Sequence, residues 1–418
     1  MGPRGEATTY MHAVPTAAEE AAATRTRPPL RTRLDRPFLA GIIAMIAVTA
    51  EVVARVIVRL QGNVSGLPLI GDVFAYRWEL PRGVEVQGYL GYDGQFYYRM
   101  ARNPANLAWS AYGIGFDAWY RLVRIGYPAL AWLGSAGQVP ALPWALVITN
   151  VLSIGAIAVL GGILAREAGR HALWGLLLAG YFGLATSVAR DLTEPVAAAL
   201  LLGAILAYRH RRLMAAAGLF ALAGLTRETA LVAPLALAVI RLYAMVRRRA
   251  RPGREDLVWL IPALVFVAWE VVLRFATGVI PIFQDSGKNA GAPFVAAVMA
   301  IGHNFGDVIR VVPGAPGAII IWDLEFLVLA GFAVMALCSL RATTVPLYER
   351  VALVLYIVEI FCLSPTNWDG YADLRSFVEV YLLATLILLA TPRRKLIWFA
   401  ATAGPMFVTV AVYRTMVL

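Results

Sequence analysis

The feature that most constrains this chain is a succession of apolar runs that fills most of its length. Crossing a hydrocarbon core of about 30 Å takes roughly 20 helical residues, and most of the runs approach this length. The shorter runs near 195 and 213 must pack obliquely. The sequence therefore predicts an all-α, polytopic membrane protein with about 11 transmembrane helices. The runs lie near residues 38–59, 141–165, 172–189, 195–208, 213–226, 229–246, 257–277, 317–340, 349–364, 376–391 and 396–415.

Charged residues are scarce in this chain, and most of them are basic. Of the 418 residues, 60% are hydrophobic and 15% are charged, whereas a soluble protein carries about a quarter charged residues. The 37 Lys and Arg exceed the 26 Asp and Glu, which gives a net charge of +11. Because the basic residues lie in short clusters beside apolar runs, we expect their anionic partners to be lipid headgroups and not nucleic acid.

The N-terminal segment differs from the rest of the chain. Residues 1–36 are polar and contain many arginines, so we expect a disordered cytoplasmic tail before a membrane domain over residues 37–418. The first apolar run, from Phe38 to Val58, is too long for a signal-peptide core and lacks a small-residue cleavage site. It is therefore predicted to be an uncleaved signal anchor.

The distribution of arginine and lysine predicts the orientation. If the N-terminus is cytoplasmic, alternation of the spans places every dense basic cluster on the cytoplasmic side, as the positive-inside rule requires. The sequence thus predicts a multi-pass protein of a bacterial cytoplasmic (inner) membrane with its acidic loop residues on the extracytoplasmic face. The basic clusters are Arg166/Arg170, Arg209/Arg211/Arg212, Arg247/Arg248/Arg249/Arg251/Arg254, Arg341/Arg350 and Arg393/Arg394/Lys395. The acidic residues are Asp93, Asp191, Glu194, Asp285, Asp369 and Asp373.

Two extracytoplasmic loops are long, at about residues 60–140 and 278–316. Loops of this length are usually functional or disordered. We expect the first to be structured, because it contains aromatic and amphipathic stretches. Its segment Tyr127–Leu133 is apolar but too short to span, so it is predicted to be an interfacial helix.

The most informative motif lies in the first of these loops, from Gly91 to Pro104 (GYDGQFYYRMARNP). Asp93 should open a helix that ends near Asn103, because Pro104 disfavours helical geometry in the residue before it. Asp93 has two interpretations. It caps this helix by accepting a backbone N–H bond, or it accepts a proton from a substrate hydroxyl at the membrane surface. The residues alone favour the cap.

An acidic residue in the first extracytoplasmic loop, soon after the first helix, resembles the GT-C superfamily of glycosyltransferases that use polyprenyl-phosphate sugars. The string YDGQFYYRMA is similar to the Asp-Gly loop of the mannosyltransferases that build glycolipid anchors. YPALAWL and the helix after Pro140 resemble the interfacial helix and second helix of bacterial aminoarabinose and protein-mannosyl transferases. Gly224–Ala230 (GLTRETA) is similar to the segment between their fifth and sixth helices. One departure is a single carboxylate in place of the Asp-Glu pair of the protein mannosyltransferases, which favours a lipid or glycan acceptor.

The resemblance implies a role for each candidate site residue. Asp93 would be the catalytic carboxylate that deprotonates or orients the acceptor hydroxyl. Arg227, Arg375 and Lys288 would bind the donor phosphate, whose charge grows as it leaves. Some members of the superfamily hold a metal or the acceptor at a second acidic site, so a divalent cation is the candidate cofactor, with its ligands left open. The acceptor- or sugar-binding candidates are Tyr92, Gln95, Arg190, Asp191, Glu194, Glu228, Trp368 and Asp369.

Two groups of these charged residues also have a purely structural interpretation. Arg227 and Glu228 could neutralise each other between helices, because ionisable groups at membrane depth need a partner. The turn that carries Arg190, Asp191 and Glu194 could be a solvated Glu-Pro helix start, and this interpretation is favoured there.

The outer half of the first helix carries a charged stripe that we expect to be structural. Glu51, Arg55 and Arg59 follow one another at intervals of four residues. Side chains with this spacing lie on one helix face. The stripe is predicted to neutralise itself by internal pairing, with Arg59 extending to the interface.

The hypothesis that accounts for these features is an inverting membrane glycosyltransferase. It would move a sugar from a polyprenyl-phosphate donor to a lipid or glycan acceptor at the outer face of the membrane. A nucleotide-sugar donor is disfavoured, because the charged loop groups face away from the cytosol. The alternatives are a lipid or lipid-linked-glycan transporter or flippase, which should show an internal repeat, and an inactive scaffold with the same fold. The sequence shows no convincing repeat, which favours the enzyme.

Overall fold

The computed structural model describes residues 34–248, 251–284, 290–309, 317–368, 374–392 and 396–404. The chain divides into two units, Met1–Asp35 and Arg36–Leu418. Only Leu34 and Asp35 of the first unit are described, so the predicted disordered tail lies almost wholly outside the described residues. The predicted basic cluster at 393–395 also lies outside them.

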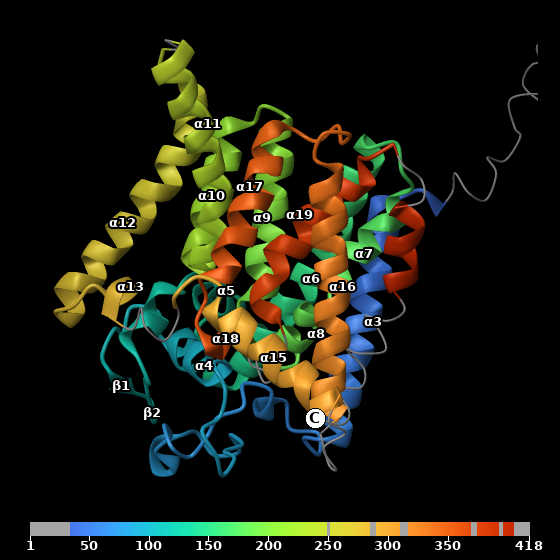
Figure 1. Cartoon of the computed structure of the whole chain (residues 1–418). Coiled ribbons are helices and arrows are strands. Elements are labelled where there is room, and N and C mark those ends of the chain that lie inside the picture. The colour runs from blue at the N-terminus through green and yellow to red at the C-terminus, as the bar shows by residue number, and fades with distance from the viewer. Residues whose placement is uncertain are drawn as a thin grey trace, which may run out of the picture. The chain divides into compact units, whose positions relative to one another are not determined.

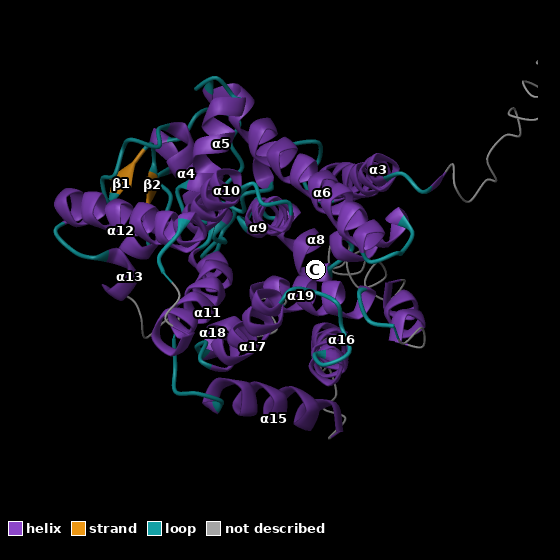
Figure 2. Ribbon diagram, turned by 90° about the horizontal axis from the view of Figure 1, so that it is seen from above, coloured by secondary structure: helices purple, strands orange, loops and turns teal. Residues whose placement is uncertain are grey.

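The second unit is mostly helical (Figures 1 and 2). Its two short strands, β1 (Ser110–Ala111) and β2 (Ile114–Gly115), form an antiparallel hairpin. Residues 396–404 are helical. The α-helices are α3 (Pro37–Val58), α4 (Gly94–Arg102), α5 (Gly126–Gly134), α6 (Leu142–Glu167), α7 (Gly175–Ala179), α8 (Phe182–Val188), α9 (Glu194–Arg209), α10 (Leu213–Thr226), α11 (Val232–Arg248), α12 (Leu257–Thr277), α13 (Pro281–Gln284), α15 (Val295–Ile309), α16 (Gly317–Ser339), α17 (Leu347–Phe361), α18 (Pro365–Trp368) and α19 (Val378–Leu389).

Five described helical segments are long and apolar enough to cross a membrane: Pro37–Val58, Val139–Glu167, Glu228–Arg247, Arg254–Thr277 and Ile320–Ser339. A hydrocarbon core has no water to satisfy exposed peptide groups, so helices of this kind are suited to span it. The predicted all-α, multi-pass membrane protein is therefore supported. Of the other predicted spans, the run at 396–415 is described only as far as residue 404 and the rest correspond to shorter helices, so the total of about 11 stays a prediction.

One predicted span is wrong as a single helix. The run at 172–189 is interrupted after α7, where Gly180 is followed by Tyr181 in an extended conformation (φ −62°, ψ 127°). Tertiary contacts hold this break: the Tyr181 hydroxyl donates to the Leu374 carbonyl at 2.7 Å, and its ring stacks on Tyr381. The hydrophobic run was recognised correctly, but these contacts divide it into pieces too short to span.

The predicted span at 376–391 contains α19, a helix that other parts of the protein shield on every side. All 12 of its residues are buried, and Figure 2 shows it enclosed by neighbouring helices, among them α16 and α17. A helix that is apolar on all sides is either a lipid-exposed span or a buried core helix. Here the apolar residues of α19 pack against protein.

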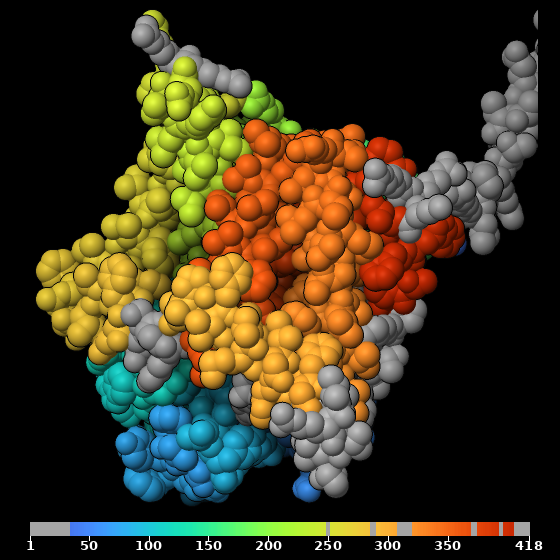
Figure 3. Space-filling view, viewed as in Figure 1, coloured from blue at the N-terminus to red at the C-terminus, as the bar shows by residue number. Residues whose placement is uncertain are grey.

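The loop over residues 60–140 is structured, as predicted. The helix expected between Asp93 and Asn103 is α4, and Asn103 ends it in an extended conformation (φ −160°, ψ 100°) before Pro104. The short helix expected at Tyr127–Leu133 is α5. In Figure 3 the loop forms a continuous layer, coloured blue to teal, at the lower left of the face drawn. The predicted loop at 278–316 contains α13 and α15.

The basic turns between helices share one end of the bundle. Arg209, at the end of α9, pairs with Glu349 of α17 at 2.5 Å and with Glu167 of α6 at 3.1 Å. Arg170 donates to the carbonyl of Leu389, the last residue of α19. The long loop over residues 60–140 lies at the opposite end (Figure 1). This agrees with the predicted alternation, while the side that faces the cytoplasm stays a prediction.

Cysteine labelling of intact cells tests the orientation. In a background in which Cys338 and Cys362 are serine, a cysteine at the exposed position Arg82 should react with an impermeant maleimide, because this loop is predicted to be extracytoplasmic. A cysteine at the exposed position Arg251 should react only after the cells are lysed. The reverse pattern would contradict the predicted orientation.

Candidate functional site

Two glycines fix the turn that carries Asp93. Gly91 has φ +72°, a conformation that favours glycine, and a Cβ there would lie 2.5 Å from the Leu69 carbonyl oxygen. A Cβ at Gly94 would lie 2.2 Å from the carbonyl oxygen of Arg190. The Gly-Tyr-Asp-Gly motif therefore provides the close approach between this loop and the turn that joins α8 to α9.

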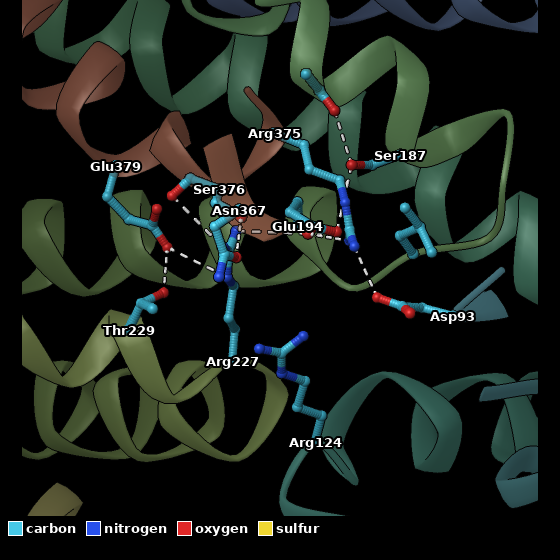
Figure 4. A network of polar contacts seen from close by, with 12 residues as sticks. Asp93, Arg124, Ser187, Glu194, Arg227, Thr229, Asn367, Arg375, Ser376 and Glu379 are labelled. Atoms are coloured by element: carbon cyan, nitrogen blue, oxygen red, sulfur yellow. Dashed lines mark hydrogen bonds and ion pairs between the residues drawn. The ribbon is translucent and has the colours of Figure 1, made fainter. Parts of the chain in front are cut away.

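Asp93 does not cap α4. Its backbone is helical (φ −55°, ψ −29°), and its side chain makes no capping hydrogen bond. Oδ2 instead accepts a hydrogen bond from Arg375 at 2.7 Å, and Oδ1 pairs with Arg121 at 2.9 Å. The capping interpretation is therefore wrong, and the carboxylate belongs to a polar network (Figure 4).

Arg375, in the turn before α19, connects Asp93 with Glu194. Its Nη1 donates to Glu194 at 2.7 Å, while Nη2 donates to Asp93. Glu194 is the first residue of α9, is followed by Pro195 and is 1% exposed. It also accepts a hydrogen bond from Ser187 at 3.2 Å. The predicted Glu-Pro helix start is confirmed, but the carboxylate is buried in the network and is not solvated.

Arg227 and Glu228 do not neutralise each other, because they point in different directions. Glu228 forms a bidentate pair with Arg124, with N–O distances of 2.6 and 2.9 Å, and also accepts a hydrogen bond from Tyr120. Arg227 faces Glu194 at 3.6 Å and Glu379 at 3.9 Å.

The guanidinium group of Arg227 is buried and only loosely held. Its side chain is 3% exposed. Among the described residues, none accepts a hydrogen bond from its Nε or Nη1. The same holds for Nε of Arg375. Buried donors are normally satisfied, so these two neighbouring cations have hydrogen-bonding capacity to spare.

The network as a whole is close to neutral. Its described residues include five carboxylates against four guanidinium groups, so the formal charge of this part is one negative. An anionic group that enters must therefore compete with carboxylates for the arginines. The carboxylates are Asp93, Asp117, Glu194, Glu228 and Glu379, and the arginines are Arg121, Arg124, Arg227 and Arg375.

The environments of Asp93 and Asp191 shift their pKa values in opposite directions. Burial alone would raise the pKa of Asp93, but Arg121 and Arg375 more than offset this and hold it well below its usual range. Burial raises the pKa of Asp191 well above its usual value, although the nearby Tyr127 hydroxyl partly opposes this. Asp93 is therefore charged at neutral pH, which makes it a good electrostatic partner but a weak base.

No protein-family model, curated protein or solved structure matches this chain. The assignment of function therefore rests on the residues and their geometry.

Gln95 and Trp368, two of the predicted sugar- or acceptor-binding residues, make contacts within the fold. The Gln95 amide accepts from the Gly71 N–H and donates to the Leu90 carbonyl, which holds the loop together. Trp368 is 1% exposed and packs against Phe377. Both side chains are occupied in holding the fold, so neither offers a free surface to a sugar.

The other predicted residues fall into three groups. Tyr92 and Arg190 lie beside the network, with the Arg190 guanidinium carbon 4.5 Å from the centre of the Tyr92 ring. Asp191 is fully buried and contacts Tyr127. Lys288 and Asp369 lie outside the described residues.

Arg121 and Arg124 are the main residues that sequence reasoning missed. Arg121 donates two hydrogen bonds of 2.8 Å to Asp117 in addition to its pair with Asp93. The spacing of Asp117 and Arg121, four residues apart, is a signal for local pairing. Sequence carries no comparable signal for the pair between Arg124 and Glu228, which are 104 residues apart.

The candidate divalent cation has no group of possible ligands among the residues that the structure describes. Among the described residues, no three His, Cys, Asp or Glu side chains are placed to hold a metal ion. The two carboxylates nearest to the centre of the network, Asp93 and Glu194, are both paired with Arg375.

A double-mutant cycle tests whether the pair between Arg124 and Glu228 fastens the loop to the helix bundle. Arg124→Met should lower the free energy of unfolding by about 3 kcal/mol, because it leaves a buried carboxylate without its cation. Combining it with Glu228→Gln should restore part of this loss. Thermal unfolding, followed by tryptophan fluorescence in detergent, provides the measurement.

The exposed pair of Arg211 and Glu255 provides the control for this cycle. The Arg211 side chain is 72% exposed, so Arg211→Met should cost less than about 1 kcal/mol. Equal losses at Arg124 and Arg211, or additive effects of Arg124→Met and Glu228→Gln, would contradict the proposed fastening role.

Proposed function

We propose that this protein is an inverting glycosyltransferase that uses a polyprenyl-phosphate sugar at the outer face of a bacterial cytoplasmic membrane. The observation that carries the proposal is the pair of largely buried guanidinium groups of Arg227 and Arg375, which both face Glu194, and of which Arg375 also binds Asp93. Both have N–H groups from which no described residue accepts a hydrogen bond. Buried cations with spare donors suit a leaving group whose negative charge grows in the transition state.

The donor phosphate would lie against Arg227 and Arg375. A guanidinium forms two parallel hydrogen bonds to a phosphate, and these are stronger than neutral hydrogen bonds. The acceptor oxygen forms a bond to the anomeric carbon while the bond between that carbon and the phosphate oxygen breaks. The electron pair of the broken bond leaves with the phosphate, and the acceptor proton passes to Asp93.

Binding of the donor would also change Asp93. The free protein holds Asp93 between two arginines, where it is a weak base. A phosphate that draws Arg375 toward itself weakens one of these two pairs. The pKa of Asp93 then rises, and the carboxylate becomes a better acceptor for the hydroxyl proton. In this proposal the donor activates the base, so the acceptor is deprotonated only when the donor is in place.

The location of the charges favours an enzyme over a transporter. Carriers place ionisable groups near the middle of the bilayer, on interrupted helices. Here the network joins the loop over residues 60–140 to the ends of helices, at the start of α9, at η6 (Glu228–Leu231) and at η9 (Arg375–Phe377). An inactive scaffold with the same arrangement is an outcome of the experiment that follows.

Transfer by the purified protein in lipid nanodiscs tests the proposal. The protein would be offered a panel of polyprenyl-phosphate sugars together with extracted membrane lipids and glycans. Asp93→Asn should reduce the turnover number by about 100-fold or more, because it removes the proton acceptor. Asp72→Asn, an exposed carboxylate in the same loop, should leave turnover unchanged. Absence of transfer from every donor by the folded wild type would contradict the proposal.

The pH dependence tests donor activation of Asp93. The lowered pKa of Asp93 in the free protein places the acid limb of kcat/KM for the donor below the usual carboxyl range, which is near pH 4. The acid limb of kcat reports the donor-bound protein and should lie at higher pH. If the acid limbs of kcat and of kcat/KM lie at the same pH, the donor does not release Asp93 from Arg375.

A further inference from the structure

A cavity of about 450 Å³ lies beside the candidate site and is lined by three arginines. Arg55 and Arg59 come from the end of the first helix, and Arg190 comes from the turn between α8 and α9. Gln87 and Tyr89 line another part of the wall. Because these segments are distant in the sequence, the fold itself brings the three cations together.

The electrostatics of this cavity differ from those of the network around Asp93. Arg190 and Arg59 both repel the charge of Arg55, and Glu51 attracts it. Glu85 lies close enough to act on Tyr89. Neither Glu51 nor Glu85 lines the cavity, and no carboxylate does among the described residues. The charged residues of the wall are therefore all cationic, whereas the network is close to neutral.

Burial strengthens the attraction of this cavity for an anion. Arg55 is 8% exposed and lies one turn from the end of α3, so its charge is little screened by water. The predicted stripe of Glu51, Arg55 and Arg59 does include the attraction of Glu51 for Arg55. It is nevertheless not neutral, because it has one carboxylate against two arginines, and Arg190 adds a third cation from another part of the chain.

One aromatic ring separates the cavity from the candidate catalytic carboxylate. The guanidinium carbons of Arg190 and Arg375 lie 4.5 and 5.1 Å from the centre of the Tyr92 ring. Arg375 in turn donates to Asp93. A ligand whose phosphate occupies the cavity could therefore extend a neighbouring hydroxyl toward Asp93.

The position of the cavity suits a lipid. Arg55 and Arg59 lie at the end of a helix long and apolar enough to span a membrane. The same end carries the exposed apolar side chains Val53 and Ile57. A lipid phosphate lies at the boundary between hydrocarbon and water, where arginines at helix ends also place their charges.

We propose that the arginine cavity binds the phosphate of an anionic lipid, and that this lipid is the acceptor of the transferred sugar. The second part rests on the proposed glycosyl transfer, whereas the first does not. The phosphate forms charge-assisted hydrogen bonds with the three arginines. The acyl chains extend along the apolar end of α3, and a headgroup hydroxyl approaches Asp93 past Tyr92.

Binding of a fluorescent short-chain phosphatidic acid to the purified full-length protein in neutral detergent tests the phosphate site. Arg59→Gln and Arg190→Gln should each weaken binding roughly ten-fold, because each removes a charge-assisted hydrogen bond. Arg82→Gln removes the same charge from an exposed position of the loop that does not line the cavity, and should change binding less than two-fold or so. Arg190→Lys, which keeps the charge, should retain part of the affinity.

Three results would overturn the lipid-phosphate site. The first is that Arg59→Gln and Arg190→Gln bind phosphatidic acid as tightly as wild type does. The second is that Arg82→Gln loses as much affinity as these two variants. The third is that wild type binds the matching diacylglycerol, which lacks phosphate, as tightly as phosphatidic acid. Displacement of the probe by inorganic phosphate as effectively as by unlabelled phosphatidic acid would show that the cavity takes a free phosphate and would also overturn the proposed lipid.

The role of the lipid as acceptor is tested separately. Asp93→Asn should bind phosphatidic acid as wild type does while losing transfer. Arg59→Gln should raise KM for the lipid acceptor roughly ten-fold and leave KM for the donor unchanged. A change in the donor KM alone would overturn the acceptor assignment. Normal phosphatidic acid binding without any transfer would leave the cavity as a lipid site and remove both the acceptor role and the proposed function.

Discussion

The structure around the candidate site depends on one interaction, the shared pairing of Arg375 with Asp93 and Glu194. Removing three charges from water is costly unless they compensate one another with good geometry. The distances of 2.7 Å from Arg375 to each carboxylate meet this condition. Because the partners come from the first loop, the start of α9 and the turn before α19, the need for mutual compensation also fixes how these three segments pack.

The same constraint divides the charged groups into two regions with different electrostatic character. Around Asp93 the arginines are nearly matched by carboxylates, so a ligand must rearrange existing pairs to bind. In the cavity with Arg55, Arg59 and Arg190, the charged residues that line the wall are all arginines, so an anionic ligand meets no carboxylate among the described residues of the wall. Tyr92 lies between the two regions, with an arginine from each close to its ring. Because the arginine cavity and the network around Asp93 are this close, one substrate can contact both.

Sequence analysis could predict the features that depend on local pattern. Apolar runs located α3, α6, α12 and α16 closely, and Pro104 located the end of α4, because hydrophobic length and proline geometry act over a few residues. The assignment of Asp93 to a functional site came from the resemblance of its motif to a known superfamily, since the residues alone favoured a helix cap.

Features that depend on distant contacts could not be predicted in this way. Nothing near Gly180 in the sequence shows that Tyr181 will donate to Leu374 and interrupt a span. Composition alone could not show that α19 is enclosed by protein. For Asp93, local rules favoured a helix cap, but the two arginines that bind its carboxylate lie elsewhere in the chain. Arg55 and Arg59 were interpreted as part of a stripe that neutralises itself, because Arg190, which joins them in the cavity, is 135 positions from Arg55 in the sequence.

The separation of Asp93 and Arg375 by 282 positions has a consequence for biogenesis. A membrane protein is synthesised and inserted from its N-terminus, so the loop with Asp93 leaves the ribosome long before the segment with Arg375. Until that segment arrives, Asp93 and Glu194 lack the cation that they share, and water must hydrate them. The site is therefore completed only after the 282 positions from Asp93 to Arg375 have been made. A nascent chain that stops short of Arg375 cannot carry the complete site, and the segment with Arg375 closes it as α19 joins the bundle.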